Sequence, residues 1–232
     1  MNPLNFVPSV IQLTLPMKSV FRISLLLWAV LCLLAPAAQA AKVKGPKKTK
    51  KDEVVTISTS LGDVRLILFD QTPKHKENFL KLAKSGFYNG TTFHRIIQDF
   101  MIQGGDPNSK DADPGNDGMG PASEQMIPAE IRPELHHKYG ALAAARQGDF
   151  VNPTRASSAS QFYIVQNHNG VPHLDGAYTV FGQVISGVDV VDKIAAQPKN
   201  MMDRPQTDIK MTVKVEKLKK KKITALYGYK YQ

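Results

Sequence analysis

The feature that most constrains the fold is a series of short β-branched segments separated by clusters of Gly, Pro, Asn and Asp. Seven or eight such segments lie between residues 54 and 218, and only two or three other segments have the apolar period of a helix. Strands and helices do not alternate in the regular way that builds a parallel sheet. The pattern predicts a mainly β fold, either a closed antiparallel barrel or a sandwich, plugged by a few helices.

The first and last strands are the most clearly marked. In IKMTVKVEKL (209–218) apolar and polar residues alternate strictly, which is typical of an antiparallel strand with one buried face. VVTISTSLGDVRLILF (54–69) has two β-branched runs around Gly62-Asp63, and it predicts a hairpin with its turn at that pair. Between them, GALAAAR (140–146) fits a helix by its alanines and a strand by its length and flanking glycines.

Two helices have recognisable boundaries. Thr72 is placed to cap the first helix, Pro73 to occupy its first position and Gly86 to end it. VDVVDKIAA (188–196) predicts a second, shorter helix.

The N-terminus has the organisation of a secretory signal peptide. Lys18 and Arg22 precede an apolar run over residues 23–34, and Ala38-Gln39-Ala40 forms an A-x-A cleavage pattern. The run is shorter than the roughly 20 apolar residues of a membrane-spanning helix, and an uncleaved anchor is the alternative. Met17 is a candidate true start, because the residues before it lengthen the signal without adding charge. The sequence predicts export to the periplasm or another extracytoplasmic space, with no membrane insertion after cleavage.

Composition divides the chain into four parts. A Lys-rich stretch with Gly and Pro follows the cleavage pattern, and this composition is typical of a flexible linker. The predicted parts are a signal peptide (1–40), a basic linker (41–53), a folded domain (54–218) and a basic, Tyr-containing tail (219–232).

The positive charge lies at the ends of the chain. The formal net charge is +10, yet residues 54–217 hold 17 Lys and Arg against 18 Asp and Glu. The excess belongs to KVKGPKKTKK (42–51) and KLKKKK (217–222). Charge confined to the ends is typical of solvated tails, and without interleaved aromatic residues it does not predict nucleic-acid binding. Tethering to an anionic envelope surface is the alternative use of these ends.

The predicted mature chain has few groups for covalent or metal chemistry. Cys32 is the only cysteine and lies in the signal peptide, so the exported protein has no disulfide, thiol nucleophile or cysteine zinc site. The sequence has no G-x-S-x-G, P-loop or H-E-x-x-H motif. His136 and His137 are adjacent and are expected to point apart. We predict no metal and no cofactor.

One segment combines a cation with apolar neighbours. FHRIIQDFMIQGGDP (93–107) predicts two short strands, about 91–97 and 100–103, joined by a bend at Gln98-Asp99. A guanidinium keeps its charge and is costly to bury without a partner, so Arg95 needs an explanation.

Strand parity offers one. Phe93 and Arg95 would share a face, and Met101 and Gln103 would share another beyond the bend. A tight bend would bring Arg95, Met101 and Gln103 onto one surface beside Phe100, where an apolar pocket meets a guanidinium and an amide. An exposed arginine on a solvated strand face is the alternative.

The same segment closely resembles the signature of the cyclophilins, which are peptidyl-prolyl cis–trans isomerases. The likeness extends in one collinear order over roughly residues 54–218. It includes SLGDVRLILF, ENFLKLAKSGFYNGTTFHR, GALAAAR, SQFYIV and LDGAYTVFGQVISGVDVVDKI. The resemblance implies a mainly β, closed eight-stranded antiparallel barrel capped by two or three short helices.

The resemblance also implies roles for individual residues. Arg95 matches the catalytic arginine, and Phe162 is expected in the core rather than in the site. The residues that match substrate-binding positions are Phe100, Met101, Gln103, Ala145, Arg146, Gln161, Tyr163, His173, Leu174 and Tyr178.

Four of these positions depart from what relatives usually carry. Arg146 stands in place of Asn and Tyr163 in place of Phe. His173 and Tyr178 replace the Trp and His of animal relatives. Because that Trp matters for cyclosporin binding in the family, we do not expect high cyclosporin affinity here.

The expected function is isomerisation of X-Pro peptide bonds in exported proteins, which assists their folding. The expected partners are proline-containing polypeptides, the expected state is a monomer, and neither metal nor nucleophile is needed because no bond breaks. The alternative is a weakly catalytic or non-catalytic, chaperone-like module that holds proline-containing segments and makes little use of Arg95.

Overall fold

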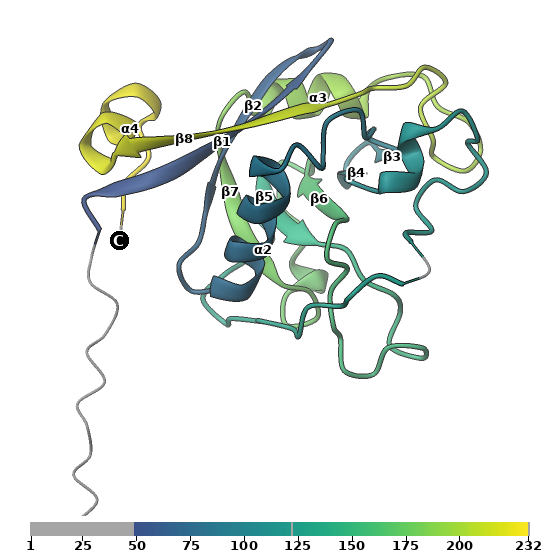
Figure 1. Ribbon diagram of the computed structural model, residues 1–232, viewed down its shortest axis with the longest axis horizontal. Coiled ribbons are helices and arrows are strands. Elements are labelled where there is room, and N and C mark those ends of the chain that lie inside the picture. The colour runs from purple at the N-terminus through teal and green to yellow at the C-terminus, as the bar shows by residue number, and fades with distance from the viewer. Residues whose placement is uncertain (1–48, 122, 232) are drawn as a thin grey trace, which may run out of the picture. The chain divides into compact units, whose positions relative to one another are not determined.

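The computed structural model describes residues 49–121 and 123–231 (Figure 1). The predicted signal peptide and residues 41–48 of the predicted linker lie outside the described residues. The described part contains an eight-stranded antiparallel sheet with the strand order β3-β4-β6-β5-β7-β2-β1-β8. None of the described helices is long and apolar enough to cross a membrane.

The strands are short, as their turn-rich spacing predicts. Their bounds are β1 Lys51–Thr59, β2 Gly62–Leu68, β3 Arg95–Ile97, β4 Met101–Gly104, β5 Ala141–Ala144, β6 Phe162–Val165, β7 Val180–Ser186 and β8 Thr212–Lys219. The helices are α2 Pro73–Lys84, α3 Val188–Ala195 and α4 Lys220–Tyr227, with 3-10 turns η2 Pro107–Lys110 and η3 Pro172–Leu174.

The β1–β2 hairpin forms, but its turn lies earlier than predicted. Thr59 pairs with Gly62, so Ser60 and Leu61 make the turn instead of Gly62-Asp63. The Thr59 hydroxyl donates to the Gly62 carbonyl at 3.0 Å and accepts from the Leu61 amide at 3.1 Å. Gly62 leaves the turn at φ +129°, a backbone conformation that side chains with a Cβ rarely adopt. The glycine therefore ends the turn and does not centre it.

The prediction of a closed barrel is wrong, because the sheet has two edges, β3 and β8. The chain before β3 meets the chain before β8 through one isolated bridge, Thr92–Lys210, and a few flanking backbone hydrogen bonds. β3 is only three residues long, and β8 pairs along its length with β1 alone. Antiparallel alternation marks each strand locally, but it does not determine whether the edge strands form a continuous ladder.

One face of the sheet covers the central core. Alternate residues of β1 and β2, such as Val55, Ile57 and Leu66, meet apolar residues of α2 and α3 there. Phe162 is buried in this core against Phe79, as predicted, with the two ring centroids 5.5 Å apart.

The residues that point to the opposite face form two further apolar patches. The open patch consists of buried Met101, Ala141, Ala143, Ala145, Tyr163, Val165, Val171 and Val180, with Phe69, Ile97, Phe100, Leu135, Leu174 and Tyr178 partly buried around them. The covered patch consists of buried Val54, Ile67 and Ile223, with Ile185, Leu218, Tyr227, Tyr229 and Tyr231 packed against them.

Helix α2 begins at Pro73 and is followed by Ser85 and by Gly86 at φ +74°, in agreement with its predicted boundaries. Thr72 precedes it but does not cap it with its side chain. Its hydroxyl donates to the Phe69 carbonyl at 3.4 Å instead, because Thr72 is fully buried and faces the turn that leads in from β2.

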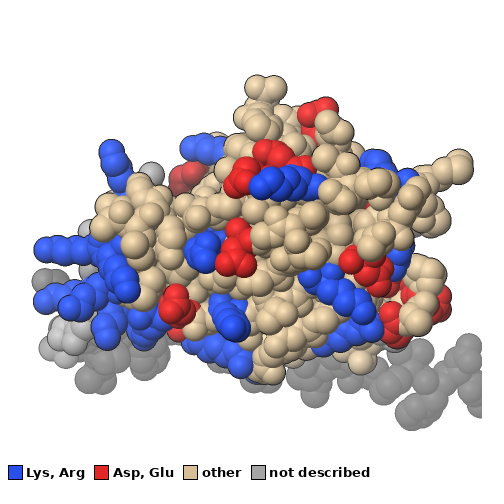
Figure 2. Space-filling view, turned by 90° about the horizontal axis from the view of Figure 1, so that it is seen from above, with Lys and Arg blue, Asp and Glu red and all other residues tan. Residues whose placement is uncertain are grey.

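The end of the chain is folded onto the sheet. Helix α4 follows β8 directly, and Ile223 of α4 packs on Val54 and Ile67, which are neighbours across β1 and β2. The Lys220 amide donates to the Lys50 carbonyl at 3.0 Å, so the two basic ends meet. Figure 2 shows Lys and Arg side chains gathered at the end of the molecule that carries α4.

Candidate active site

Strand register places Arg95 in a row of side chains that crosses four strands. Arg95 of β3 pairs with Gln103 of β4, Gln103 pairs with Tyr163 of β6, and Tyr163 pairs with Ala143 of β5. Paired residues project to the same face of a sheet, and Tyr163 and Ala143 belong to the open patch. The guanidinium therefore rises from the sheet at the border of an apolar surface.

The bend between β3 and β4 sets this register. Asp99 has φ +59°, a left-handed conformation that Asp tolerates better than most residues. Its amide donates to the Gln166 side chain at 2.6 Å, which ties the bend to the end of β6. Among the ion pairs of the described residues, none joins Arg95 to Asp99. The sequence expectation that Phe93 shares the Arg95 face is wrong, because β3 begins only at Arg95 and Phe93 packs in the central core.

The apolar walls of the site come from the open patch. Met101 is 2% exposed and Tyr163 5% exposed, while Phe100, Leu174 and Tyr178 remain partly accessible. These five side chains come from the bend before β4, from β4, from β6 and from the segment around η3, and the fold brings them to one surface. They offer a proline ring a patch of aromatic and aliphatic contacts.

His173 lies at the rim of this surface. Its ring stacks on Phe100 with centroids 6.1 Å apart, and the residue is exposed. It therefore extends the aromatic wall outward, although with a smaller and more polar ring than Trp.

Two amides link the arginine row to a neighbouring loop. The Gln103 side chain donates to the Gln161 side-chain oxygen at 3.1 Å, and Gln161 donates to the Gly118 carbonyl at 3.1 Å. Gly118 has φ +84°, which favours glycine at the point where the loop presents its carbonyl. The two amides are fixed in one orientation by this chain of hydrogen bonds.

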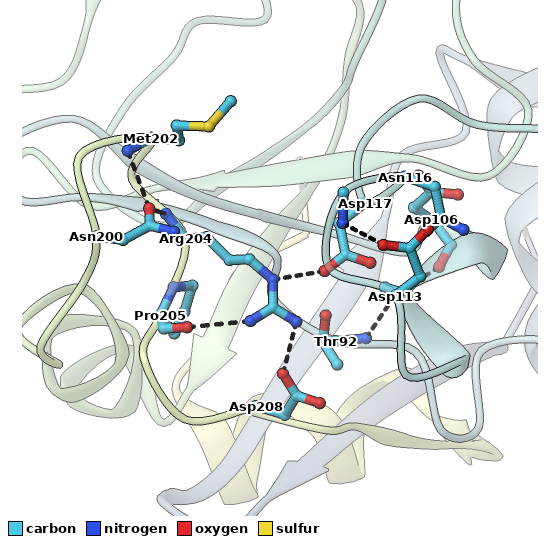
Figure 3. A network of polar contacts seen from close by, with 12 residues as sticks. Thr92, Asp106, Asp113, Asn116, Asp117, Asn200, Met202, Arg204, Pro205 and Asp208 are labelled. Carbon is cyan, nitrogen blue, oxygen red and sulfur yellow. Dashed lines mark hydrogen bonds and ion pairs between the residues drawn. The ribbon is translucent and has the colours of Figure 1, made fainter.

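The loop that carries Gly118 is also held by an arginine from a distant segment of the chain, Arg204, which binds Asp117. Arg204 donates to Asp117 at 2.7 Å and to Asp208 at 2.8 Å (Figure 3). Asp106 holds the same loop at its base, accepting from the Asn108 and Gly120 amides at 3.0 Å each. Sequence reasoning missed this clamp, because its members are far apart in the chain.

Ala145 and Arg146, the predicted pair whose backbone would hold the substrate, follow β5 and differ in their hydrogen bonds. The Ala145 amide donates to the Gln161 carbonyl at 3.0 Å, and the Ala145 carbonyl accepts from the Ser158 amide at 2.9 Å. Within the described residues, no hydrogen bond involves the backbone of Arg146. Ala145 is thus tied into the fold, whereas the backbone N–H and C=O of Arg146 have no hydrogen-bond partner among the described residues.

The side chain of Arg146 fastens the walls of the site. Its guanidinium lies over the Tyr178 ring, 4.3 Å from the centroid, and Nε donates to the Ala177 carbonyl at 2.9 Å. It also pairs with Asp149 at 2.6 Å, which lowers the pKa of that carboxyl. Arg146 thus binds the segment after η3 to the end of β5.

Two residues that sequence reasoning did not assign lie directly behind the site. His136 and His137, expected to point apart, both bind one carboxylate: their Nδ1 atoms lie 2.8 and 2.6 Å from the two oxygens of Asp175. His137 also contacts the Tyr163 hydroxyl through Nε2 at 3.0 Å. The three residues lie in two separate segments, HHKYG (136–140) and LDG (174–176). Nothing in the sequence indicates that these segments meet in the fold.

The arrangement defines a class of protein. The Arg95 guanidinium, two oriented amides and aromatic walls lie together on an open sheet face, and they suit a site that binds a peptide and changes its conformation. In the described part of the chain, no three side chains of the metal-binding types come together.

Comparison with known proteins names the family. The sequence model described as "Cyclophilin type peptidyl-prolyl cis-trans isomerase/CLD" matches residues 54–215. The chain is 41% identical over 161 residues to peptidyl-prolyl cis-trans isomerase CYP18-1 of Arabidopsis thaliana, a match that covers 68% of this chain and 91% of the relative. It is 40% identical over 171 residues to peptidyl-prolyl cis-trans isomerase-like 2 of Rhizopus delemar, covering 71% of this chain but 29% of that longer protein.

Solved structures agree. A cyclophilin-type peptidyl-prolyl cis-trans isomerase of Cryptosporidium parvum superposes with a TM-score of 0.62 and 32% identity, covering 72% of this chain and 98% of that one. A second crystal structure of that protein was obtained in the presence of the dipeptide Ala-Pro. A cyclophilin of Hirschia baltica, 21% identical with a TM-score of 0.55, shares the fold.

The chain belongs to the cyclophilin-type peptidyl-prolyl cis–trans isomerases. Its reaction is the rotation of the peptide bond that precedes proline, and its substrates are proline-containing polypeptides.

Proposed function

We propose that this isomerase acts on X-Pro bonds of exported proteins, with Arg95 as the donor that stabilises the twisted bond. One observation supports the role of Arg95 above all. The register pairs it with Gln103, which in turn pairs with Tyr163 of the open patch, so that a cation lies two strands from an apolar site suited to a proline ring.

The reaction needs little more than this. Amide resonance gives an X-Pro bond a rotation barrier of about 18–20 kcal/mol, and no covalent bond is broken on the way. Twisting removes the conjugation of the prolyl nitrogen, which then becomes a better hydrogen-bond acceptor. A guanidinium that donates to it in the twisted state, and less in either planar state, lowers the barrier. A donor used in this way is worth roughly 3–4 kcal/mol in favourable sites.

The surrounding groups hold the substrate. Phe100, Met101 and Tyr163 receive the proline ring, and the backbone of Arg146, which has no hydrogen-bond partner among the described residues, binds the peptide on one side. Gln103 donates its amide nitrogen to Gln161, so its oxygen is the group that it can offer to Arg95. The Ala-Pro dipeptide used with the Cryptosporidium neighbour supports a small proline-containing ligand of this kind.

Export rests on the sequence of the N-terminus. The basic residues, apolar run and A-x-A pattern of residues 18–40 fit a cleavable signal, and the chain beyond Cys32 has no thiol that an oxidising compartment could cross-link. We place the mature protein in the periplasm or a similar space, as a monomer. Fractionation of cells that express the full chain tests this: a mature protein that stays in the cytoplasm would contradict it.

The role of Arg95 is tested by exchange NMR on a short X-Pro peptide with purified mature protein. Arg95→Ala is expected to lower kcat/KM by about 100- to 1,000-fold, the kinetic equivalent of roughly 3–4 kcal/mol, with an unchanged circular dichroism spectrum and urea midpoint. Arg95→Lys is expected to recover little, because an ammonium lacks the planar fork.

Near wild-type exchange by Arg95→Ala would remove this role. A wild-type protein that binds the peptide but does not speed its exchange would favour the holding module over the enzyme.

A further inference from the structure

A buried histidine lies behind the pocket. His137 precedes β5, is 2% exposed, and stacks nearly parallel to the Tyr163 ring, with centroids 6.0 Å apart. It also meets the edge of Tyr178, at 6.4 Å and 88°. A side chain that touches two aromatic walls of the site from inside is placed to control their positions.

The contacts of His137 determine which nitrogen carries the proton. Nδ1 lies 2.6 Å from Oδ1 of Asp175, whose other oxygen binds His136. The carboxylate also accepts from the His137 amide at 2.9 Å. Since an ionised carboxylate only accepts, Nδ1 carries the hydrogen and Nε2 presents its lone pair. The Tyr163 hydroxyl, 3.0 Å away, is then the donor to Nε2.

We propose that His137 is a positioning residue for the isomerase: held by Asp175, it accepts the Tyr163 hydroxyl and fixes that ring as a wall of the proline pocket. The proposal rests on the assignment of Tyr163 to the pocket. It gives a purpose to the tyrosine, since a phenylalanine there would have no such anchor. It also gives Asp175 an indirect role in the site: Asp175 orients His137 and does not itself contact the substrate.

The position of Tyr163 explains why its orientation matters. It is the member of the four-strand row next to Gln103, and its ring also meets Tyr178 edge-on at 6.0 Å. Tyr178 is in turn held by Arg146. A displacement of the Tyr163 ring would disturb both the proline wall and the wall beside it, and the hydrogen bond to His137 opposes that displacement.

The anchor is sensitive to acid. A proton on Nε2 turns it from an acceptor into a donor, so the Tyr163 hydroxyl loses the group that receives its hydrogen. Burial lowers the pKa of His137 from its ordinary value of 6.5, although the hydrogen bond and charge of Asp175 oppose this. The titratable and charged groups around His137 and Tyr163 are Asp175, His136, His173, Tyr178 and Arg146.

A double-mutant cycle tests the anchor. His137→Leu in the wild-type chain is expected to lower kcat/KM by about five- to tenfold, the equivalent of one neutral hydrogen bond. In a Tyr163→Phe background the same substitution is expected to change kcat/KM by less than about twofold, because the hydroxyl is already gone. Equal losses in the two backgrounds would show that His137 supports only the fold, and would overturn the proposal.

The pH dependence of kcat/KM distinguishes a positioning role of His137 from a purely structural one. The wild-type kcat/KM is expected to fall at acid pH, with a midpoint below the ordinary histidine value of 6.5 because burial lowers the pKa of His137. His137→Gln keeps an acceptor near the Nε2 position but does not titrate, so it should retain activity within about twofold and lose the step. Tyr163→Phe should lose the step as well. A step that persists in His137→Gln would overturn the proposal.

Two controls separate the possible failures. Circular dichroism at each pH shows that the protein is folded while the rate changes. His168→Asn removes an exposed histidine and should leave the pH step unchanged. A wild-type protein without any isomerase activity would instead disprove the proposed function of the site, whereas an active one without coupling disproves only the anchor.

Discussion

The open patch and the covered patch lie on the same face of the sheet, turned away from the central core, and they differ in what covers them. Both are built from alternate residues of neighbouring strands, and both are rich in tyrosine. The chain covers one of them with its own α4 and the residues that follow it. It leaves the other partly exposed, with Arg95 at its border.

The comparison separates apolar surface that stabilises from apolar surface that binds. In the covered patch the three buried residues pack against partly buried side chains of the chain's own C-terminal segment, and Ile223 is completely buried. In the open patch, polar groups at the edge hold the walls in place while Phe100, Leu174 and Tyr178 keep accessible area. In the proposed function, a substrate proline would gain on the open patch the burial that α4 has already gained on the covered one.

The largest expected effect comes from removing the cover. Deletion of residues 220–232 exposes Val54 and Ile67 and removes Ile223, so the free energy of unfolding should fall by at least about 4 kcal/mol, at roughly 1.5–3 kcal/mol for each buried aliphatic side chain. Because the site is built elsewhere, kcat/KM measured in the cold on the folded fraction should stay within about twofold. Urea denaturation and exchange NMR measure the two quantities.

The control for this deletion is Leu226→Ala, since Leu226 lies on the same helix and is 56% exposed. It should change stability by less than about 0.5 kcal/mol. A truncated protein as stable as the full chain would show that the tail covers nothing of consequence.

A matched pair of substitutions sharpens the comparison. Met101→Ala in the open patch and Ile223→Ala in the covered patch remove side chains that are 2% and 0% exposed. Each should cost about 2–3 kcal/mol of stability, in the lower part of the usual range for such cavities. Only Met101→Ala should also lower kcat/KM, by at least about tenfold. Equal losses of activity in the two variants would mean that the patches are not functionally distinct.

Acid should destabilise the protein through buried histidines of the open side and of the central core. The covered patch contains no histidine and should not contribute to this effect. Burial lowers the pKa of His75, His94 and His137 below the ordinary value of 6.5. The unfolded chain then binds protons that the folded chain resists, so the free energy of unfolding decreases as pH falls from 6.5 toward the lowered values. Urea midpoints measured from about pH 8 to pH 5 should decrease, and the decrease should be smaller in His137→Gln.

The smallest effect concerns the rim. His173→Trp should enlarge the aromatic wall beside Phe100 and raise cyclosporin affinity by about tenfold, which corresponds to about 1.4 kcal/mol. The rate of peptide isomerisation should change by less than about threefold, since Arg95 and Met101 are untouched. Because residues 41–232 contain no tryptophan, the new residue also reports binding by fluorescence in a protein that lacks residues 1–40. Unchanged cyclosporin affinity would show that the rim position does not limit binding.

Much of the fold could be predicted from the sequence, because alternation and turn residues act locally. The strand β8, the ends of α2 and the bend at Asp99 all follow from residues within a few positions of one another. The shared surface of Arg95 and Gln103 follows from strand parity once the bend is known.

The rest depends on contacts between distant segments. Closure of a barrel depends on the edge strands β3 and β8. The residues of these two strands do not indicate whether the strands pair with each other. Asp175 draws His136 and His137 together, Arg204 fastens the loop of Gly118, and α4 finds Val54 and Ile67. In each case the partner is identified only by the tertiary structure.

The meeting of Lys50 with Lys220 has a consequence for engineering. The polypeptide enters and leaves the fold at one corner, where Lys51 also pairs with Lys219 in the sheet. A short linker could therefore join the two ends and new termini be cut into an exposed loop, which is the geometry that circular permutation requires. A protein fused at either end would be attached at the same corner, next to the edge strand β8, whereas Arg95 lies on the other edge strand, β3.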